Sequence, residues 1–273
     1  MAKIYKIHPE TPQTRTLEQV IGELRQGAVM LYPTDTVYAI GCDLLSKDAI
    51  ERVRQLKQMS NDKPLTFLCP SLSNIAHYAM VTDAAYRIMK SLIPGPYTFI
   101  LPTTKLVPKL VLNPKRKTTG IRVPDHGVCQ ALLTTLGNPI ISSSANLGQN
   151  QSSLSEDLAD ELADDAMLSY GKAKGKSKSG KNGSYGKSSG GSAAVNQEIK
   201  SAKAANRSGS NSQQNIYELS QVELFDYFDK LVDIIIDDGS QNRAGVSTIL
   251  DMTGERPELV RQGAGDVSFL FES

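Results

Sequence analysis

Short apolar runs of β type alternate along this chain with segments whose apolar residues recur at helical spacing. The first pair is a helix that Thr16 can cap and Gly27 can stop, followed by the strand Val29–Tyr32. The same patterns predict helices beginning at Ser46 and over 83–92 and 128–136, and strands over 65–69, 97–101, 120–123, 140–143, 232–236, 246–251 and 259–261. Helices that alternate with strands in this way favour an α/β fold built around one sheet.

Residues 168–215 interrupt this pattern. They are mostly Gly, Ser, Lys, Ala and Asn, and they hold nine Lys and Arg residues against one acidic residue. A segment with so few large apolar side chains cannot bury enough surface to offset the entropy of ordering. We therefore predict one domain formed by residues 1–167 and 216–273, with a helix from Ser155 to about Met167 and a disordered basic insertion over 168–215. The charge of the insertion leaves a contact with nucleic acid open beside the more common solvated linker.

Composition narrows the class of protein. Residues 1–150 carry 17 Lys and Arg against 10 Asp and Glu, which favours anionic partners. The apolar runs are far shorter than the roughly 20 residues of a membrane helix, and residues 1–10 have no leader-like apolar core, so we expect a cytoplasmic protein without a membrane span. Cys42, Cys69 and Cys129 lie among apolar residues and are expected to be reduced thiols in or near the core. With three histidines and no metal-ligand spacing, neither a protein-held metal nor a Ser-His-Asp triad is expected.

Small hydrogen-bonding residues follow the first apolar strand in the segment Pro33-Thr34-Asp35-Thr36-Val37-Tyr38. Open α/β sheets usually bind their ligands at strand ends, so the segment can form the floor of a site for a small polar substrate. Its proline and aspartate are equally typical of a plain turn. The residues of this segment alone leave both interpretations open.

Cations and hydroxyls recur at other predicted helix and strand ends. They are Lys57 and Lys63 near the end of the second helix, Arg122 within the Gly120 strand, Ser144 and Asn146 at the end of the Ile140 strand, Ser247 at the start of the 246–251 strand, and Arg261. Lysine at a helix end and serine at a cap each have an ordinary explanation. Arg122 is different, because a guanidinium within an apolar run needs an anion beside it.

Seven blocks of this sequence resemble a known family. They are Pro33–Tyr38, Lys57 with Lys63–Leu65, Pro94–Thr98, Gly120–Pro124, Ser143–Asn146, Ser247–Asp251 and Val260–Gly263. In this order they are similar to the YrdC/YciO-type threonylcarbamoyl-adenylate synthases, and Tyr97–Leu101 with residues 115–118 places the likeness nearest the YciO branch. The resemblance covers about residues 12–165 and 230–265, and the basic insertion has no counterpart in it.

This resemblance implies a twisted, open, mixed α/β sheet with flanking helices and a concave basic face. It implies a reaction that joins L-threonine, bicarbonate and ATP, with Mg²⁺, into threonylcarbamoyl-adenylate and pyrophosphate on the way to a modified transfer RNA. Carried over by position, the resemblance assigns L-threonine to Thr36, Arg122 and Ser247, with Tyr38 added from its place in the motif, and ATP to Lys57, Lys63, Thr118, Ser144, Asn146 and Arg261. No side chain is expected to act as a nucleophile.

One position departs from the family pattern. Active members usually carry a lysine, any residue and then an arginine, whereas this chain has Lys57-Gln58-Met59. Losing one charge-assisted contact of about 1.5 to 3 kcal/mol reduces rate or affinity by roughly one to two decades. The sequence therefore predicts a synthase weakened at Met59, and it leaves open an alternative, a protein that binds double-stranded or otherwise structured RNA without synthase activity.

Overall fold

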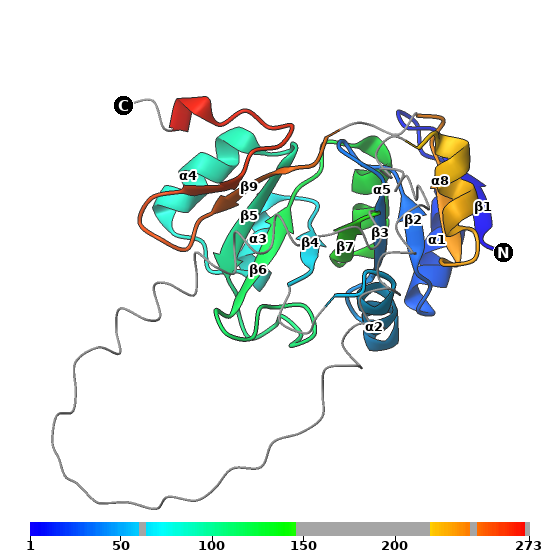
Figure 1. Ribbon diagram of the computed structural model, residues 1–273, viewed down its shortest axis with the longest axis horizontal. Helices are drawn as coiled ribbons and strands as arrows, with labels where there is room; N and C mark the ends of the chain where they lie inside the picture. Colours follow the sequence, from blue (N-terminus) through cyan, green and yellow to red (C-terminus); the bar gives the residue numbers. More distant parts are fainter. Residues whose placement is uncertain (60–63, 146–218, 241–244, 271–273) are drawn as a thin grey trace, which may run out of the picture. The chain divides into compact units, whose positions relative to one another are not determined.

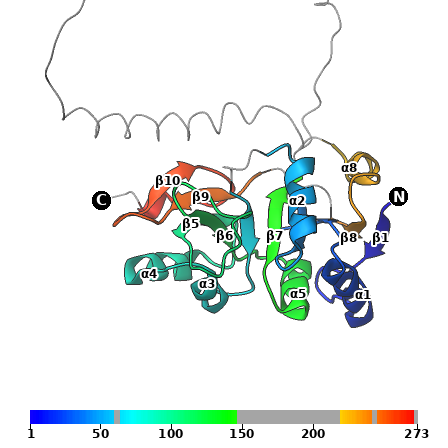
Figure 2. The ribbon, with the colours of Figure 1, turned by 90° about the horizontal axis from the view of Figure 1, so that it is seen from below.

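The computed structural model describes residues 1–59, 64–145, 219–240 and 245–270. Within these ranges one mixed sheet has the strand order β1-β8-β2-β3-β7-β4-β6-β5-β9-β10 (Figures 1 and 2). The strands are β1 (Lys3–Lys6), β2 (Met30–Tyr32), β3 (Ala39–Asp43), β4 (Thr66–Leu68), β5 (Tyr97–Pro102), β6 (Thr118–Arg122), β7 (Ile140–Ser144), β8 (Ile234–Asp237), β9 (Thr248–Asp251) and β10 (Glu258–Arg261). The mixed α/β fold that the sequence predicts is confirmed.

The described helices pack on this sheet. They are α1 (Thr14–Arg25), α2 (Lys47–Leu56), α3 (Leu72–Tyr78), α4 (Asp83–Leu92), α5 (Gly127–Leu136) and α8 (Gln221–Phe228), with a 3-10 turn at Ser268–Leu270. Figures 1 and 2 both place α1 beside α5, and α4 and α8 toward opposite ends of the sheet. The buried apolar side chains of α1 and α5 belong to one cluster, and those of α2, α3, α4 and α8 belong to a second, larger cluster.

The last part of the chain returns to both ends of the sheet. β8 lies between β1 and β2 and pairs in parallel with each of them. β9 pairs in parallel with β5 at the other end, and β10 pairs antiparallel with β9. Segments on both sides of residues 146–218 therefore build the same sheet, as Figure 1 shows by colour. The helix predicted over 155–167 and the insertion predicted over 168–215 lie outside the described residues.

The two faces of the central strands differ in chemistry. One row of paired residues runs across six strands and is buried and apolar: Cys42, Ile141, Phe67, Ile121, Phe99 and Leu250. The row one residue along each strand faces the other way, because successive side chains of a strand alternate between faces. It is Gly41, Ser142, Thr66, Gly120, Ile100 and Asp251. We call the face that carries this second row the polar face.

Several element ends differ from the sequence predictions. The prediction that Thr16 caps the first helix is wrong: α1 begins at Thr14, because the carbonyl of Gln13 already accepts the first helical bond from Leu17 N–H at 3.0 Å. Ser46 caps α2 as expected, accepting from the amide of Ala49. Gly27 follows α1 with φ of +93°, a left-handed conformation that glycine adopts without strain. The strands β1 and β3 and the helices α3 and α8 were not predicted.

The three cysteines are free and buried, as the sequence predicts. Cys42 and Cys69 belong to the larger apolar cluster, and Cys129 belongs to the smaller one. Burial raises the pKa of the Cys42 and Cys69 thiols to about 12. These two thiols are therefore core side chains of low reactivity.

Candidate functional site

Predicted site residues from three strands lie on the polar face. Thr118 and Arg122 lie two residues before and after Gly120, so their side chains share its face. Ser144 lies two residues after Ser142 on β7, and Arg261 of β10 pairs with Ile249, two residues before Asp251. Strand register thus brings together residues that are up to 143 positions apart in the sequence.

Arg261 reaches this face because of a β-bulge. Leu259 pairs with Leu250, but the next pair is Arg261 with Ile249, so Val260 is the extra residue of the bulge. Without this shift Arg261 would pair one residue along β9 and face the apolar side. Its Nη2 donates to the carbonyl of Ser247 at 2.7 Å.

Ser247 joins Arg261 to the neighbouring strand β5. The hydroxyls of Ser247 and Thr98 lie 2.9 Å apart, and both side chains are buried. Gly263 keeps this corner compact, because a Cβ there would lie 2.3 Å from the carbonyl oxygen of Val246. Ser247, Thr98 and Arg261 therefore form one hydrogen-bonded group at the β5-β9-β10 end of the polar face.

Gly120 leaves the centre of the polar face without a side chain, and there is little room for one. A Cβ at this position would come within 3.2 Å of both Thr66 Oγ1 and Thr98 Cγ2. None of the polar-face residues on β6 belongs to either apolar cluster. Beside them, the Asp251 carboxylate accepts from Arg116 Nη2 at 2.9 Å, so this acidic member of the row is paired. The surface beside Arg122 is consequently built from small side chains and hydroxyls.

Arg122 has the anion that its sequence context predicts. Its Nη2 lies 2.6 Å from Asp35 Oδ1, its Nη1 donates to Thr36 Oγ1 at 2.8 Å, and both members of the ion pair are about 8% exposed. Two polar atoms of the pair, Arg122 Nε and Asp35 Oδ2, are buried and have no hydrogen-bond partner. A buried donor or acceptor without a partner loses its hydration without compensation, so these atoms are suited to a ligand.

The loop 33–38 is the turn that its proline and aspartate indicate, and it lies beside Arg122. It is the bend that joins the antiparallel strands β2 and β3, and Thr34 fixes it by accepting from the amide of Thr36 and donating to the carbonyl of Val37. The same loop presents Asp35 and Thr36 to Arg122. Tyr38 ends the loop, and its hydroxyl donates toward Asp238 Oδ1 at 3.3 Å.

Lys57 lies at the end of α2, where its side chain reaches the end of β7. It is the C-terminal cap of that helix, it is only 5% exposed, and its Nζ donates to the carbonyl of Ser144 at 2.9 Å. Burial lowers the pKa of Lys57 to about 8. A phosphate group placed beside this ammonium would favour its charged form.

Met59 does not face the polar surface. Its side chain is partly buried and packs against the larger apolar cluster. Arg54, a nearby cation on α2, is buried and donates to the carbonyl of Leu110 at 3.0 Å. The predicted site residues Lys63 and Asn146 lie outside the described residues.

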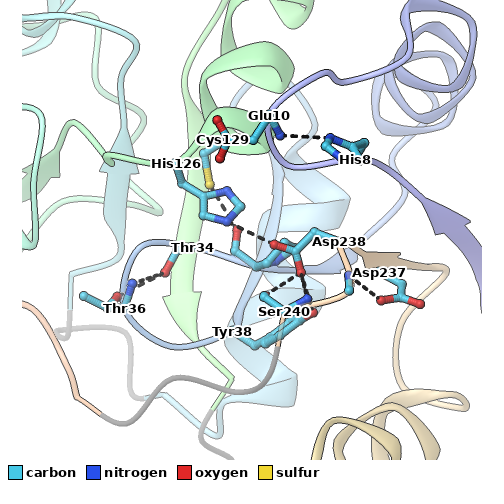
Figure 3. Close-up of polar contacts among 12 residues, drawn as sticks. His8, Glu10, Thr34, Thr36, Tyr38, His126, Cys129, Asp237, Asp238 and Ser240 are labelled. Carbon is cyan, nitrogen blue, oxygen red and sulfur yellow. Dashed lines mark hydrogen bonds and ion pairs between the residues drawn. The ribbon is translucent and has the colours of Figure 1, made fainter.

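A buried contact between a histidine and an aspartate was not predicted from the sequence. His126 Nε2 lies 3.1 Å from Asp238 Oδ2, and both side chains are almost fully buried. Ser240 Oγ donates to the other carboxylate oxygen at 2.6 Å (Figure 3). Burial opposes ionisation of Asp238, but the hydrogen bonds from His126 and Ser240 outweigh it and lower the pKa of Asp238 to about 2. The run Asp237-Asp238-Gly239-Ser240 after a buried apolar strand was the available signal.

Within the described ranges, no group of three or more His, Cys, Asp or Glu side chains is arranged to hold a metal ion. No helix in the same part of the chain is both long and apolar enough to cross a membrane.

The fold and the polar face define a mixed α/β protein with a cationic, hydroxyl-rich site on one side of its sheet. The Sua5/YciO/YrdC family model, whose description reads "Telomere recombination", matches residues 23–180, more than half of the chain. The chain therefore belongs to the Sua5/YciO/YrdC family.

Individual relatives agree with this assignment. The chain is 44% identical over 147 residues to the protein YciO of Escherichia coli K12, covering 54% of this chain and 71% of YciO. It is 35% identical over 150 residues to threonylcarbamoyl-AMP synthase of Vibrio vulnificus, covering 54% of this chain and 80% of the synthase. The crystal structure of E. coli YciO superimposes with a TM-score of 0.67 at 32% identity, covering 97% of this chain and 98% of that one.

Proposed function

We propose that this protein is an L-threonylcarbamoyladenylate synthase. The observation that carries the proposal is the convergence of Arg122, Ser144 and Arg261 on one face of the sheet, with Thr36 bonded to Arg122 and Lys57 bonded to Ser144. This arrangement suits two anionic substrates held side by side. The synthase relatives at 35% identity support the same reaction class.

The amino acid is assigned to the end of the face beside the loop 33–38. Arg122 Nε, a buried donor without a partner, is suited to the carboxylate of L-threonine. Thr36 and Ser247 supply hydroxyls on either side of it, and Tyr38 closes the loop next to Thr36. Asp35 holds the Arg122 guanidinium in place by accepting from Nη2, which leaves other N–H donors of the guanidinium available.

The nucleotide is assigned to the cations and hydroxyls along the rest of the face. The proposed ATP contacts are Lys57, Lys63, Thr118, Ser144, Asn146 and Arg261. Lys63 and Asn146 stay predictions from the sequence, because neither lies in the described residues. Mg²⁺ is proposed to enter bound to the ATP phosphates, as part of the substrate.

The chemistry requires positioning more than a protein nucleophile. Threonine and bicarbonate form a carbamate, and the carbamate oxygen attacks the α-phosphorus of ATP while pyrophosphate leaves. Two anions must be brought together, and negative charge grows on the leaving group. Cations already held in place stabilise that charge without reorganising in the reaction. A cytoplasmic location stays a prediction from the sequence.

Threonine binding tests the assignment of Arg122. In Arg122→Lys the charge beside Asp35 is kept, but the planar fork that can hold a carboxylate is lost. We expect the affinity for L-threonine, measured by calorimetry on the full chain, to fall about 10- to 100-fold, which corresponds to one charge-assisted hydrogen bond. The exposed arginine Arg87 on α4 provides the control Arg87→Lys. Equal affinities for all three proteins would overturn the assignment.

A second candidate function is binding to structured RNA. The segment 103–117 between β5 and β6 holds no acidic residue and exposes Lys105, Lys109, Lys115, Arg116 and Lys117. Such a loop suits phosphate groups of transfer RNA or another folded RNA. RNA affinity should then fall steeply with salt, and replacing Lys115 and Lys117 by Gln should reduce the salt slope. Salt-independent affinity would rule this function out.

A further inference from the structure

Three buried side-chain polar atoms in the described part of the chain have no hydrogen-bond partner, and all three belong to one neighbourhood. They are Asp35 Oδ2, Arg122 Nε and His126 Nδ1. Asp35 and Arg122 form an ion pair, and His126 follows Arg122 by four residues, at the position that caps α5. These atoms come from the loop 33–38, the end of β6 and the start of α5.

Cys129 links His126 to the amino-acid end of the polar face. It lies one turn into α5, and its thiol donates to the carbonyl of Pro33, the first residue of the loop, at 3.1 Å. Burial raises the pKa of this thiol. The nearby carboxylates of Asp35 and Asp238 also raise it, whereas the Arg122 guanidinium lowers it. Figure 3 shows His126, Thr34 and Asp238 grouped around the same loop. The histidine therefore lies at the start of a helix that contacts the loop 33–38, which carries Asp35 and Thr36.

The three unpartnered atoms complement a zwitterionic amino acid. Arg122 Nε is a donor, as a carboxylate requires, whereas Asp35 Oδ2 and His126 Nδ1 can accept from an ammonium group. The Asp238 carboxylate can only accept, so the proton of a neutral His126 ring lies on Nε2 and the lone pair lies on Nδ1. An aspartate that fixes a histidine tautomer in this way leaves the other ring nitrogen free to act as a base.

We propose that His126 is a catalytic residue whose Nδ1 takes a proton from the ammonium group of bound L-threonine, with Asp238 as its positioning residue. This inference rests on the proposed synthase function. The N–H bond breaks, its electron pair stays on the amine nitrogen, and the proton moves to Nδ1. The amine then forms a C–N bond to the carbon of bicarbonate. One of its two hydrogens leaves with the bicarbonate hydroxyl as water, and the imidazolium returns its proton to solvent.

The test compares the full-length parent with His126→Asn, Asp238→Asn and the double variant. Asparagine at 126 keeps a hydrogen-bond acceptor near the position of Nδ1 but cannot take a proton. An amide at 238 can donate to Nε2, which moves the ring proton to Nδ1 and removes the base. Each single variant should lower kcat for adenylate formation by about 10²- to 10⁴-fold. The double variant should be no worse than the worse single variant, and L-threonine affinity should stay within about threefold for His126→Asn.

Two measurements separate this role from a structural one. Nitrogen-15 NMR of the parent should show the His126 proton on Nε2, and Asp238→Asn should shift it to Nδ1. Thermal unfolding shows whether each variant folds, and His77→Asn, at an exposed histidine on α3, is the control that should match the parent.

The outcomes are distinguishable. An active parent with both single variants within about threefold of its kcat would overturn the role of His126 and leave the proposed function standing. A ring proton on Nδ1 of the neutral parent would also overturn it. A parent that neither binds L-threonine nor forms the adenylate would overturn the proposed function and the role of His126 together.

Discussion

The buried ammonium of Lys57 should make stability depend on pH in a defined direction. Burial lowers the pKa of Lys57 from 10.5 to about 8 in the folded protein. This difference corresponds to about 3 kcal/mol, the free energy by which folding disfavours the charged form. Because the unfolded chain holds this proton more tightly, the penalty is fully present below about pH 8. It fades as pH rises from about 8 toward 10.5.

Lys57→Met removes this titration. The variant also leaves the carbonyl of Ser144 without its Lys57 donor, which costs about 1 to 3 kcal/mol, so the two effects nearly cancel at neutral pH. The pH dependence does not cancel. We expect the unfolding free energy of the parent to rise by about 1 kcal/mol relative to the variant between pH 7 and pH 9.

Urea unfolding at pH 7, 8 and 9 measures this difference. Lys90→Met, at an exposed lysine in the last turn of α4, is the matched control and should follow the parent at every pH. A difference between parent and Lys57→Met that stays constant over this range would refute the argument from burial. Under the proposed function, ATP binding at pH 8 should also raise the pKa of Lys57 and take up protons, which calorimetry in two buffers detects.

Two further substitutions test the polar face. Met59→Arg should raise adenylate formation by roughly one to two decades if the guanidinium reaches phosphate. The same substitution should lower stability, because Met59 packs against the apolar cluster. An unchanged rate in a folded variant would show that this position does not limit activity. Gly120→Ala should cost about 1 to 3 kcal/mol of stability and weaken ligand binding, because the added methyl group comes within 3.2 Å of Thr66 and Thr98. Gly22, whose Cβ would meet nothing within 4 Å, is the control position, and equal melting temperatures for the two alanine variants would contradict the steric argument.

Periodicity and capping chemistry predicted the elements that obey local rules. α2 begins after Ser46 because a serine hydroxyl can accept from the first turn, and the sequence shows that directly. β3 was missed because all five of its residues are buried, so no alternation of polar and apolar residues marks it. β1 was missed because it is a short strand with two lysines and little burial. Thr16 has the right chemistry for a cap but lies inside the helix.

The site could be predicted where the local sequence around one residue implies a partner for it. Arg122 lies in an apolar run and requires an anion, and Asp35 supplies it. The pairing of His126 with Asp238 could not be inferred in the same way, because the two residues are 112 positions apart and meet only through the order of the strands. The face on which Arg261 lies depends on a one-residue bulge, which local sequence does not specify.

Formation of the adenylate is the most direct measurement of the account as a whole. The full-length protein is incubated with Mg-ATP, L-threonine and carbon-14 bicarbonate, and the products are separated and counted. We predict a labelled threonylcarbamoyl-adenylate that requires all three substrates, is nearly lost in Arg122→Lys and is unchanged in Arg87→Lys. No labelled adenylate from the parent at high protein concentration, or an equal amount from Arg122→Lys, would contradict the claim that the polar face joins threonine to a nucleotide.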